Sequence, residues 1–180
     1  MTNLSMPRRE ALQKLAILLG GTLSFPAQAA LRGEVINGLP IDIPADLQVL
    51  AANLAEVILP TTDTPGAKEA GVGGFITRVI RDCTTRSEQD KFLEGLRKTD
   101  TRSQAAFGKA FSELSGPQQV EIVGQLAQQE KEFFLAMREL TIVGYFTSEL
   151  GATKTLEYLA VPGRFQGDIP LKPGQRVWAI

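Results

Sequence analysis

The stretch between Phe133 and Phe146 constrains the fold of this chain more than any other. It reads FFLAMRELTIVGYF, and its apolar side chains point in nearly every direction around a helical period. A helix that is apolar on all sides belongs in the interior of a domain, and this one is too short to cross a bilayer, which needs about 20 apolar residues. We therefore predict an all-α fold, a compact bundle around a central apolar helix over about residues 133–146. Its two charged residues, Arg138 and Glu139, either form a buried pair or lie on one solvent-facing edge, and we favour the edge because buried charges are rare.

Two absences in the composition exclude whole classes of site. The 180 residues, enough for one domain with a real core, include no histidine, which removes His-based triads, His metal sites and His-ligated haem. The single cysteine, Cys83, excludes an intrachain disulfide and the usual haem attachment motif, and its apolar neighbours favour a small core residue over a reactive thiol. The net charge of −1 offers no electrostatic footprint for nucleic acid. Catalysis would have to proceed without imidazole, which disfavours an enzyme.

Residues 1–29 have the features of an export signal. Arg8 and Arg9 lie in a short basic region, a modestly apolar run follows, and Ala27-Gln28-Ala29 has the small-x-small pattern of a cleavage site. The adjacent arginines and the weakly apolar run resemble a twin-arginine signal, whose pathway exports folded proteins, although Ala11 stands where Phe is usual. An ordinary secretory signal and a retained anchor helix are the alternatives.

Helical periodicity and capping signals indicate that residues 30–180 form a single helical domain. An irregular, extended lead-in over 30–44 comes first. Besides the central helix, helices are expected over Ala45–Leu59, over Val72–Cys83, from Ser87 onward, over Ala105–Leu114 as one piece or two broken near Gly108, from Ser115 onward, and over Glu149–Tyr158. Alternation with a period of two persists nowhere, so no sheet of consequence is expected.

Local signals set these boundaries. Pro44 opens the first helix where a missing N–H costs nothing, Ser87-Glu88-Gln89-Asp90 has the pattern of a capping box with Asp where Glu or Gln is usual, and Ser115-Gly116-Pro117-Gln118 is a second such signal. The polar segment Lys98–Gln104 is expected to interrupt the third helix, and Glu130–Glu132 is interpreted as a solvated face.

Four of the expected helices have a predicted apolar inner face. In chain order these faces are Leu47, Leu50, Leu54, Val57 and Ile58; Val72, Phe75, Ile76, Val79, Ile80 and Cys83; Phe92, Leu93 and Leu96; and Val120, Val123, Leu126 and Ala127.

The connection Pro60–Gly74, PTTDTPGAKEAGVGG, is polar and rich in glycine. Its glycines match neither the dinucleotide fingerprint nor the P-loop, and no strand precedes it. Asp63 and Glu69 offer too few oxygen ligands for calcium. We therefore interpret it as a structural loop in which Asp63 or Thr64 caps a short turn of helix.

The C-terminal residues from Ala160 to Ile180 have a different character. Proline and glycine alternate with apolar residues that lack helical spacing, which indicates an extended strap packed on its own bundle or on another subunit.

Three separated motifs carry a family resemblance. ILPTTDTPGAKEAGVGGFI (58–76), ELTIVGYFTSELGA (139–152), and VPGRFQGDIPL (161–171) closing on VWAI (177–180) resemble the third, small subunit of membrane-bound gluconate 2-dehydrogenase and related sugar dehydrogenases. The resemblance covers essentially the whole chain after the signal.

The resemblance implies a chain without activity, cofactor or metal of its own. FAD is expected in a large flavoprotein of the glucose–methanol–choline type, and haem c in a cytochrome subunit that relays electrons to the membrane. The small subunit would bind the flavoprotein and, through Arg8 and Arg9 and the twin-arginine translocase, carry it folded into the periplasm, where the complex associates with the membrane. Many relatives have Cys where this chain has Asp168, so any role of that thiol, such as an inter-subunit bridge, does not carry over.

Under this interpretation the partner would be contacted by two segments. One is the loop with Thr61, Thr62, Asp63 and Thr64, and the other is the C-terminal strap with Arg164, Phe165 and Trp178. Trp and Arg dominate interface energetics. The equal alternative for Trp178 is a side chain buried in the core at the end of the chain. The alternatives are a free-standing periplasmic helical binding module and an independent hydrolase or isomerase that uses Asp63 and Glu69.

Overall fold

A computed structural model describes residues 42–161, 163–164, 168, 170 and 173–178. Apart from residues 1–40, the chain forms one compact unit, Ile41–Ile180. The predicted signal over 1–29, with Arg8 and Arg9, lies outside the described residues. So do Phe165 and the lead-in up to residue 41.

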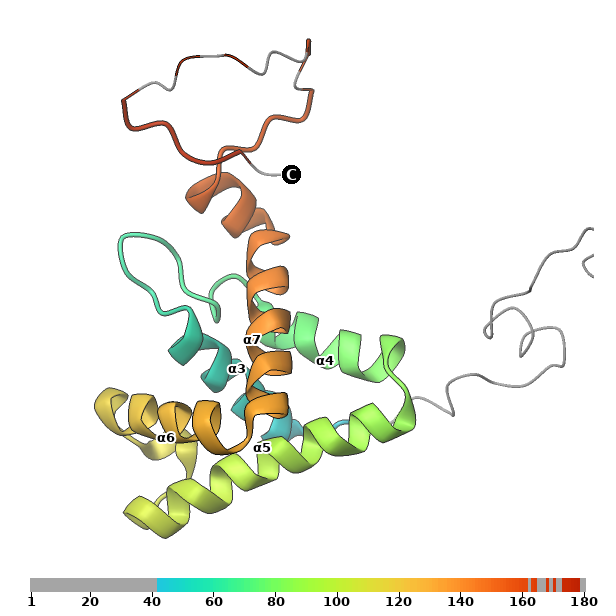
Figure 1. The fold of residues 1–180 in the computed structure, drawn as a ribbon, viewed down its shortest axis with the longest axis vertical. Helices are drawn as coiled ribbons and strands as arrows, with labels where there is room; N and C mark the ends of the chain where they lie inside the picture. The colour runs from blue at the N-terminus through green and yellow to red at the C-terminus, as the bar shows by residue number, and fades with distance from the viewer. Residues whose placement is uncertain (1–41, 162, 165–167, 169, 171–172, 179–180) are drawn as a thin grey trace, which may run out of the picture. The chain divides into compact units, whose positions relative to one another are not determined.

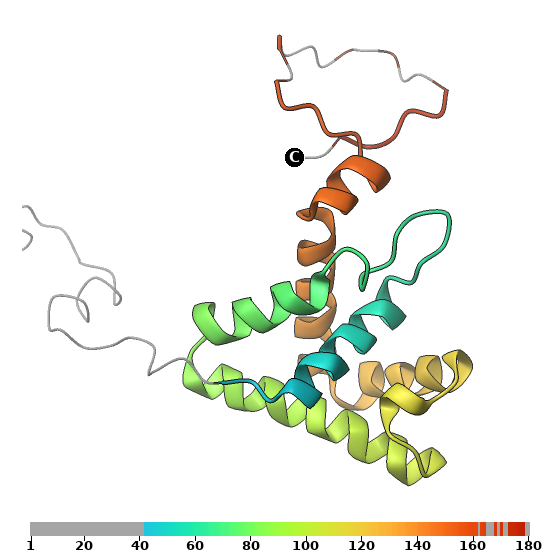
Figure 2. The same cartoon turned by 180° about the vertical axis from the view of Figure 1, so that it is seen from behind.

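The described residues form helices joined by short connections (Figures 1 and 2). The elements are α3 (Ala45–Ile58), α4 (Val72–Cys83), α5 (Arg86–Phe107), the short 3₁₀ turn η1 (Phe111–Glu113), α6 (Gly116–Gln129), α7 (Lys131–Phe146) and the π-helical turn η2 (Gly151–Thr155). In this part of the chain the extended pairing is limited to an isolated bridge between Glu157 and Trp178. The predicted all-α bundle is confirmed.

Helix α3 lies in the middle of the bundle and contacts α4, α5, α6, α7 and η1. It lies behind α7 in Figure 1 and in front of it in Figure 2. The predicted stripe of Leu47, Leu50 and Leu54 is buried, and Ala51 and Ala55 are buried beside it. Small residues allow α4 to approach closely, because a Cβ on Gly73 would lie 2.6 Å from the Cβ of Ala52. Pro44 and Pro60 flank this helix as predicted.

Helix α7 is covered by α3, α4, α5 and α6 on one side. Met137, Thr141, Gly144 and Tyr145 are buried there, and the Phe75 ring lies against Gly144. Among the described elements, none of the other α-helices covers the opposite side. Its exposed large apolar residues are Leu135, Ile142, Val143 and Phe146. The prediction of burial on all sides is therefore wrong for one face, because the other helices contact α7 from one side only.

The two charged residues of α7 lie where we expected them. Arg138 and Glu139 are both exposed, so the interpretation as a solvent-facing edge is confirmed and a buried pair is excluded.

Helix α5 is longer than predicted at both ends. Thr85, two residues before the expected Ser87, is the N-cap and forms a capping box with Glu88, the residue type usual at that position. The polar segment Lys98–Gln104 does not interrupt the helix. The buried hydroxyl of Thr99 donates to the Gly95 carbonyl and that of Ser103 donates to the Thr99 carbonyl, so neither competes with helix geometry. The predicted break comes at Gly108, whose φ of +68° ends the helix.

Cys83 is exposed, so its prediction as a core residue is wrong. It is the last residue of α4, one turn beyond the buried Ile80, and the chain turns away there. The last carbonyls of α4 are hydrogen-bonded by the side chain of Gln89. The two N–H groups of its buried amide are shared among the carbonyls of Ile80, Arg81 and Thr84, which lie 3.1, 3.1 and 3.2 Å from Nε2.

The predicted inner face of α6 is partly wrong. Ser115 is the N-cap as expected, with the Gln118 side chain accepting from its N–H and hydroxyl. Leu126 is buried as predicted, but the second buried residue is Ile122, while Val120 is 61% exposed. Ile122 and Leu126 are four residues apart and so share one face.

Because α3 lies in the middle of the bundle, shortening one of its buried side chains should strongly destabilise the fold. Leu54 is 1% exposed, and its replacement in Leu54→Ala should lower the free energy of unfolding by about 2–5 kcal/mol. Val49 on the same helix is 57% exposed, and Val49→Ala should change it by about 0.5 kcal/mol or less. Denaturant unfolding of both variants checks this, and equal losses would contradict the assignment of the core.

The capping box of α5 predicts a dependence of stability on pH. The Thr85 N–H and hydroxyl each donate to the Glu88 carboxylate at 2.7 Å, and these bonds hold the pKa of Glu88 below its ordinary value of 4.5. Because the folded-state pKa is the lower one, the stabilisation is complete above pH 4.5 and is lost as the pH falls through the lowered pKa. Denaturant midpoints at decreasing pH should therefore fall more steeply for the natural chain than for Glu88→Gln, and parallel curves would contradict it.

Candidate functional site

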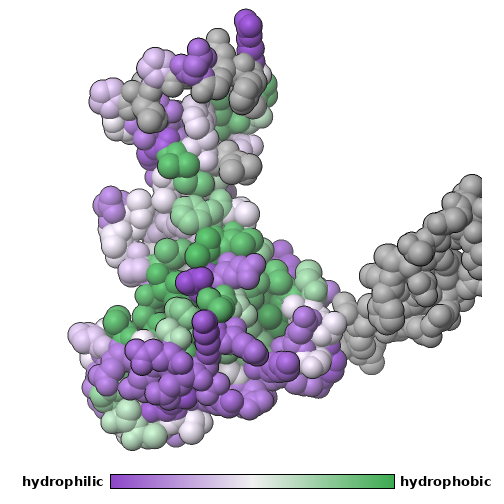
Figure 3. Space-filling model, in the orientation of Figure 1, coloured by the Kyte–Doolittle hydropathy of each residue, from purple (hydrophilic) through white to green (hydrophobic). Residues whose placement is uncertain are grey.

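Most exposed apolar side chains of the described residues lie on α7 and on the residues that follow η2. We call the described residues after η2 the C-terminal segment (156–161, 163–164, 168, 170 and 173–178). Nine of the eleven exposed large hydrophobic residues belong to α7 or to this segment, and the other two, Val49 and Val120, lie singly on α3 and α6. We call the nine the apolar surface: Leu135, Ile142, Val143, Phe146, Tyr158, Leu159, Val161, Val177 and Trp178. In Figure 3, apolar residues gather along α7, above the mainly hydrophilic surface of α5 and α6. Exposed apolar groups that cluster in this way mark interaction sites.

The spacing of the helical members explains how they come together. Leu135, Ile142 and Phe146 are seven and four residues apart, so they lie on one side of α7. The opposite side of the same helix supplies the buried Met137 and Thr141. One apolar sequence thus serves both the core and the surface.

The C-terminal segment returns to η2, which follows α7. The Glu157 N–H donates to the Val177 carbonyl at 2.8 Å, and the Arg176 guanidinium donates to the carbonyls of Thr153 and Lys154. Residues 176–178 of the predicted strap therefore pack on their own chain at η2. The helix predicted over Glu149–Tyr158 ends earlier, at Thr155, because residue 157 takes part in this extended pairing.

Trp178 lies in this pairing and is 45% exposed, so it is not a core plug. Arg164, the other described member of the predicted strap contacts, is also exposed. Both are available at the surface, and their contact with a partner stays a prediction.

The loop after α3 is organised by Glu56, a residue that the sequence analysis did not single out. Its carboxylate accepts from the Thr61 N–H (3.0 Å), the Thr61 hydroxyl (2.9 Å) and the Lys68 N–H (2.8 Å). Gly66 lies against this carboxylate, since an added Cβ would be 2.4 Å from it. A single acidic residue near the end of a helix gives too weak a signal to reveal this role.

Within this loop Thr61, Thr62 and Asp63 are exposed and Thr64 is half-buried. Asp63 was predicted to cap a short turn of helix, but it does not. It accepts from the Thr62 hydroxyl at 2.9 Å, and Thr64 contributes its backbone carbonyl to the Thr62 N–H.

The N-cap of the following helix, α4, is Gly71, whose φ is +72°. Its left-handed conformation suits glycine and leaves no side chain to cap the helix.

The described residues contain no group of three or more His, Cys, Asp or Glu side chains that could hold a metal ion. Asp63 and Glu69, the carboxylates considered for catalysis, are both exposed. In the same part of the chain, no helix is long and apolar enough to span a bilayer.

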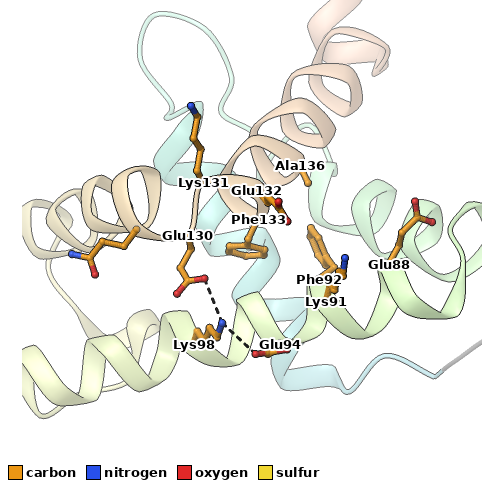
Figure 4. Close-up of a pocket in the computed structure, with 11 residues that line it drawn as sticks. Glu88, Lys91, Phe92, Glu94, Lys98, Glu130, Lys131, Glu132, Phe133 and Ala136 are labelled. Atoms are coloured by element: carbon orange, nitrogen blue, oxygen red, sulfur yellow. Dashed lines mark hydrogen bonds and ion pairs between the residues drawn. The ribbon is translucent and has the colours of Figure 1, made fainter.

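A cleft of about 490 Å³ lies between α5 and the junction of α6 with α7 (Figure 4). The Phe92 and Phe133 rings lie at its base with their centroids 5.4 Å apart. Gly95 allows this approach, because an added Cβ would meet the Phe133 ring at 2.2 Å. The two aromatic rings thus pack α5 closely against α7 where the cleft lies.

The rim of this cleft is charged, and α5 is joined to Glu130, the residue between α6 and α7, by ion pairs on the rim and beside it. Lys98 Nζ lies 3.2 Å from Glu94 and 3.4 Å from Glu130, and Arg102 lies 3.2 Å from Glu130. Hydrogen bonds to Glu94 and then Glu130 raise the pKa of Lys98. Glu130 was predicted to be part of a solvated face, but it is half-buried in these pairs, whereas Lys131 and Glu132 are exposed as expected.

Comparison with protein families places this helical chain among the subunits of an oxidoreductase. Residues 45–163 match the family described as gluconate 2-dehydrogenase subunit 3. The chain therefore belongs to this family, and the resemblance inferred from its motifs is confirmed. The match begins at the first residue of α3 and includes every helix of the described residues. Comparison with curated proteins and comparison with solved structures gave no match.

Proposed function

We propose that this chain is the non-catalytic small subunit of a periplasmic FAD-dependent gluconate or sugar dehydrogenase. It binds the flavoprotein subunit, supports its folding and accompanies it through the twin-arginine translocase. FAD resides in the flavoprotein, haem c in a cytochrome c subunit, and the assembled complex associates with the membrane. Membership of a family of gluconate 2-dehydrogenase subunits, which implies association with the other subunits, supports this assignment.

The observation that carries the proposal is the apolar surface. Side chains such as Ile142, Phe146 and Trp178 are between 36% and 45% exposed in the isolated chain, and their contact with water is unfavourable. Aromatic residues are enriched at the cores of protein interfaces. A subunit of a complex is expected to cover such a surface with its partner, and the flavoprotein is the partner to which we assign it.

The export role rests on the sequence of the first 29 residues, with Arg8 and Arg9 adjacent. A pathway that exports folded proteins suits a passenger that must take up FAD before it leaves the cytoplasm. The signal on this chain then serves the flavoprotein bound to it.

Replacement of Arg8 and Arg9 by Lys tests the export role. We expect the flavoprotein and its activity to stay in the cytoplasmic fraction, because the paired arginines are the recognised feature of the signal. Fractionation with an activity assay measures this. As a control, Arg138→Lys, at an exposed site of α7, should leave export unchanged. Normal periplasmic activity in the Arg8→Lys/Arg9→Lys variant would contradict the proposed export role.

Polar substitutions on the apolar surface test the binding role. Ile142→Ser and Phe146→Ser should each weaken binding of the flavoprotein by about tenfold or more, since each removes a large apolar side chain from the interface. Trp178→Ala should act in the same direction. Val120→Ser is the matched control, because Val120 is an exposed apolar residue on α6.

Binding is measured by co-purification of the two chains and by titration of the purified subunits. Circular dichroism of each variant verifies that the isolated small subunit stays folded. Unchanged binding in all three surface variants would remove the apolar surface from the interface. A chain that purifies as a monomer with no flavoprotein would instead favour a free-standing binding module.

A further inference from the structure

Two parts of the surface that lie far apart in the sequence meet at the hydroxyl of Tyr145. This side chain is 3% exposed and lies near the end of α7. Its oxygen is 2.6 Å from the carbonyl of Pro65, in the loop after α3, and 2.7 Å from the hydroxyl of Thr155, in η2. One buried oxygen thus bridges the loop and the turn on which the C-terminal segment is fastened.

The direction of both hydrogen bonds follows from the chemistry of the groups. A carbonyl can only accept, so the single hydroxyl proton of Tyr145 is donated to Pro65. The Thr155 hydroxyl must then donate to the Tyr145 oxygen. The two bonds form a chain from Thr155 through Tyr145 to Pro65, and bonds in such chains polarise and strengthen each other.

Each of the two segments has its own second anchor. Glu56 of α3 holds the loop through Thr61 and Lys68. Arg176 and the Glu157–Val177 hydrogen bond hold the end of the C-terminal segment to η2. Tyr145 connects these two anchored pieces to each other through α7.

We propose that the Tyr145 hydroxyl is a positioning group that couples the loop Pro60–Gly71 to η2 and the C-terminal segment, so that both present a single pre-set surface to the flavoprotein. The identity of the partner rests on the proposed function, whereas the coupling is a property of the isolated chain. A surface that is ordered before binding loses less conformational freedom on association and binds more tightly.

Tyr145→Phe removes the hydroxyl and keeps the ring. Three backbone amides report on the two segments, because each donates to a backbone carbonyl: Thr62 in the loop, and Leu156 and Glu157 beyond η2. Their hydrogen exchange should become about three- to tenfold faster, as expected for the loss of one hydrogen bond. Hydrogen exchange followed by NMR in the full chain measures both segments together. Acceleration in only one segment, or in neither, would overturn the coupling.

Thr155 provides the matched variants. Thr155→Val removes the donor but leaves the bond from Tyr145 to Pro65, so the amides of Leu156 and Glu157 should exchange faster while that of Thr62 changes little. Thr155→Ser restores the donor and should return all three rates to those of the natural chain. Failure of Thr155→Ser to restore them would assign the effect to packing rather than to the hydroxyl.

Titration with the flavoprotein separates positioning from stability. Tyr145→Phe should weaken binding about three- to tenfold. Leu54→Ala destabilises the core more, but it lies on α3, outside both segments, and should leave the affinity of the folded chain unchanged. Equal weakening in both variants would overturn the positioning role. Faster exchange without any flavoprotein binding in the natural chain would keep the coupling and reject the proposed function instead.

Discussion

Helix α7 carries more apolar surface than the other described helices cover, and the core and the proposed interface both depend on this excess. Met137, Thr141 and Tyr145 complete the core on one side. On the other side Ile142 and Phe146 remain 40% and 36% exposed. Because burial of apolar area is the main favourable term in both folding and association, the same helix can stabilise the bundle and provide the driving force for binding a partner.

The elements around α7 hold it where both roles are possible. Glycine at position 95 lets the Phe133 ring pack against α5, and the ion pairs of Glu130 with Lys98 and Arg102 fix the preceding turn. At the other end, the Tyr145 hydroxyl joins the loop after α3 to η2. The helix is therefore anchored at both ends while the face between them stays open.

Sequence reasoning found the elements because their signals are local. Pro44, Gly108 and the Ser115–Gln118 pair end or begin helices through nearest neighbours, and each was located correctly. It failed where the answer depends on which side a neighbouring helix covers, as for the open face of α7 and for the exposed Val120.

The candidate site was less predictable than the fold for the same reason. The loop Thr61–Thr64 and Trp178 were recognised from composition and residue type and are at the surface, with Thr64 half-buried. The contributions of Ile142, Phe146 and Glu56 depend on tertiary contacts, and an apolar run alone does not say which of its faces is covered. A run that is apolar on all sides is thus compatible with an interior helix and with an interface helix.

Hydroxyl-radical footprinting tests most directly whether a partner covers the open face of α7. The rates of side-chain labelling would be compared between the isolated chain and the complex purified with the flavoprotein. We predict strong protection of Phe146, Tyr158 and Trp178 in the complex, with Val49 and Val120 labelled as in the isolated chain. Equal labelling of Phe146 in both samples would contradict it.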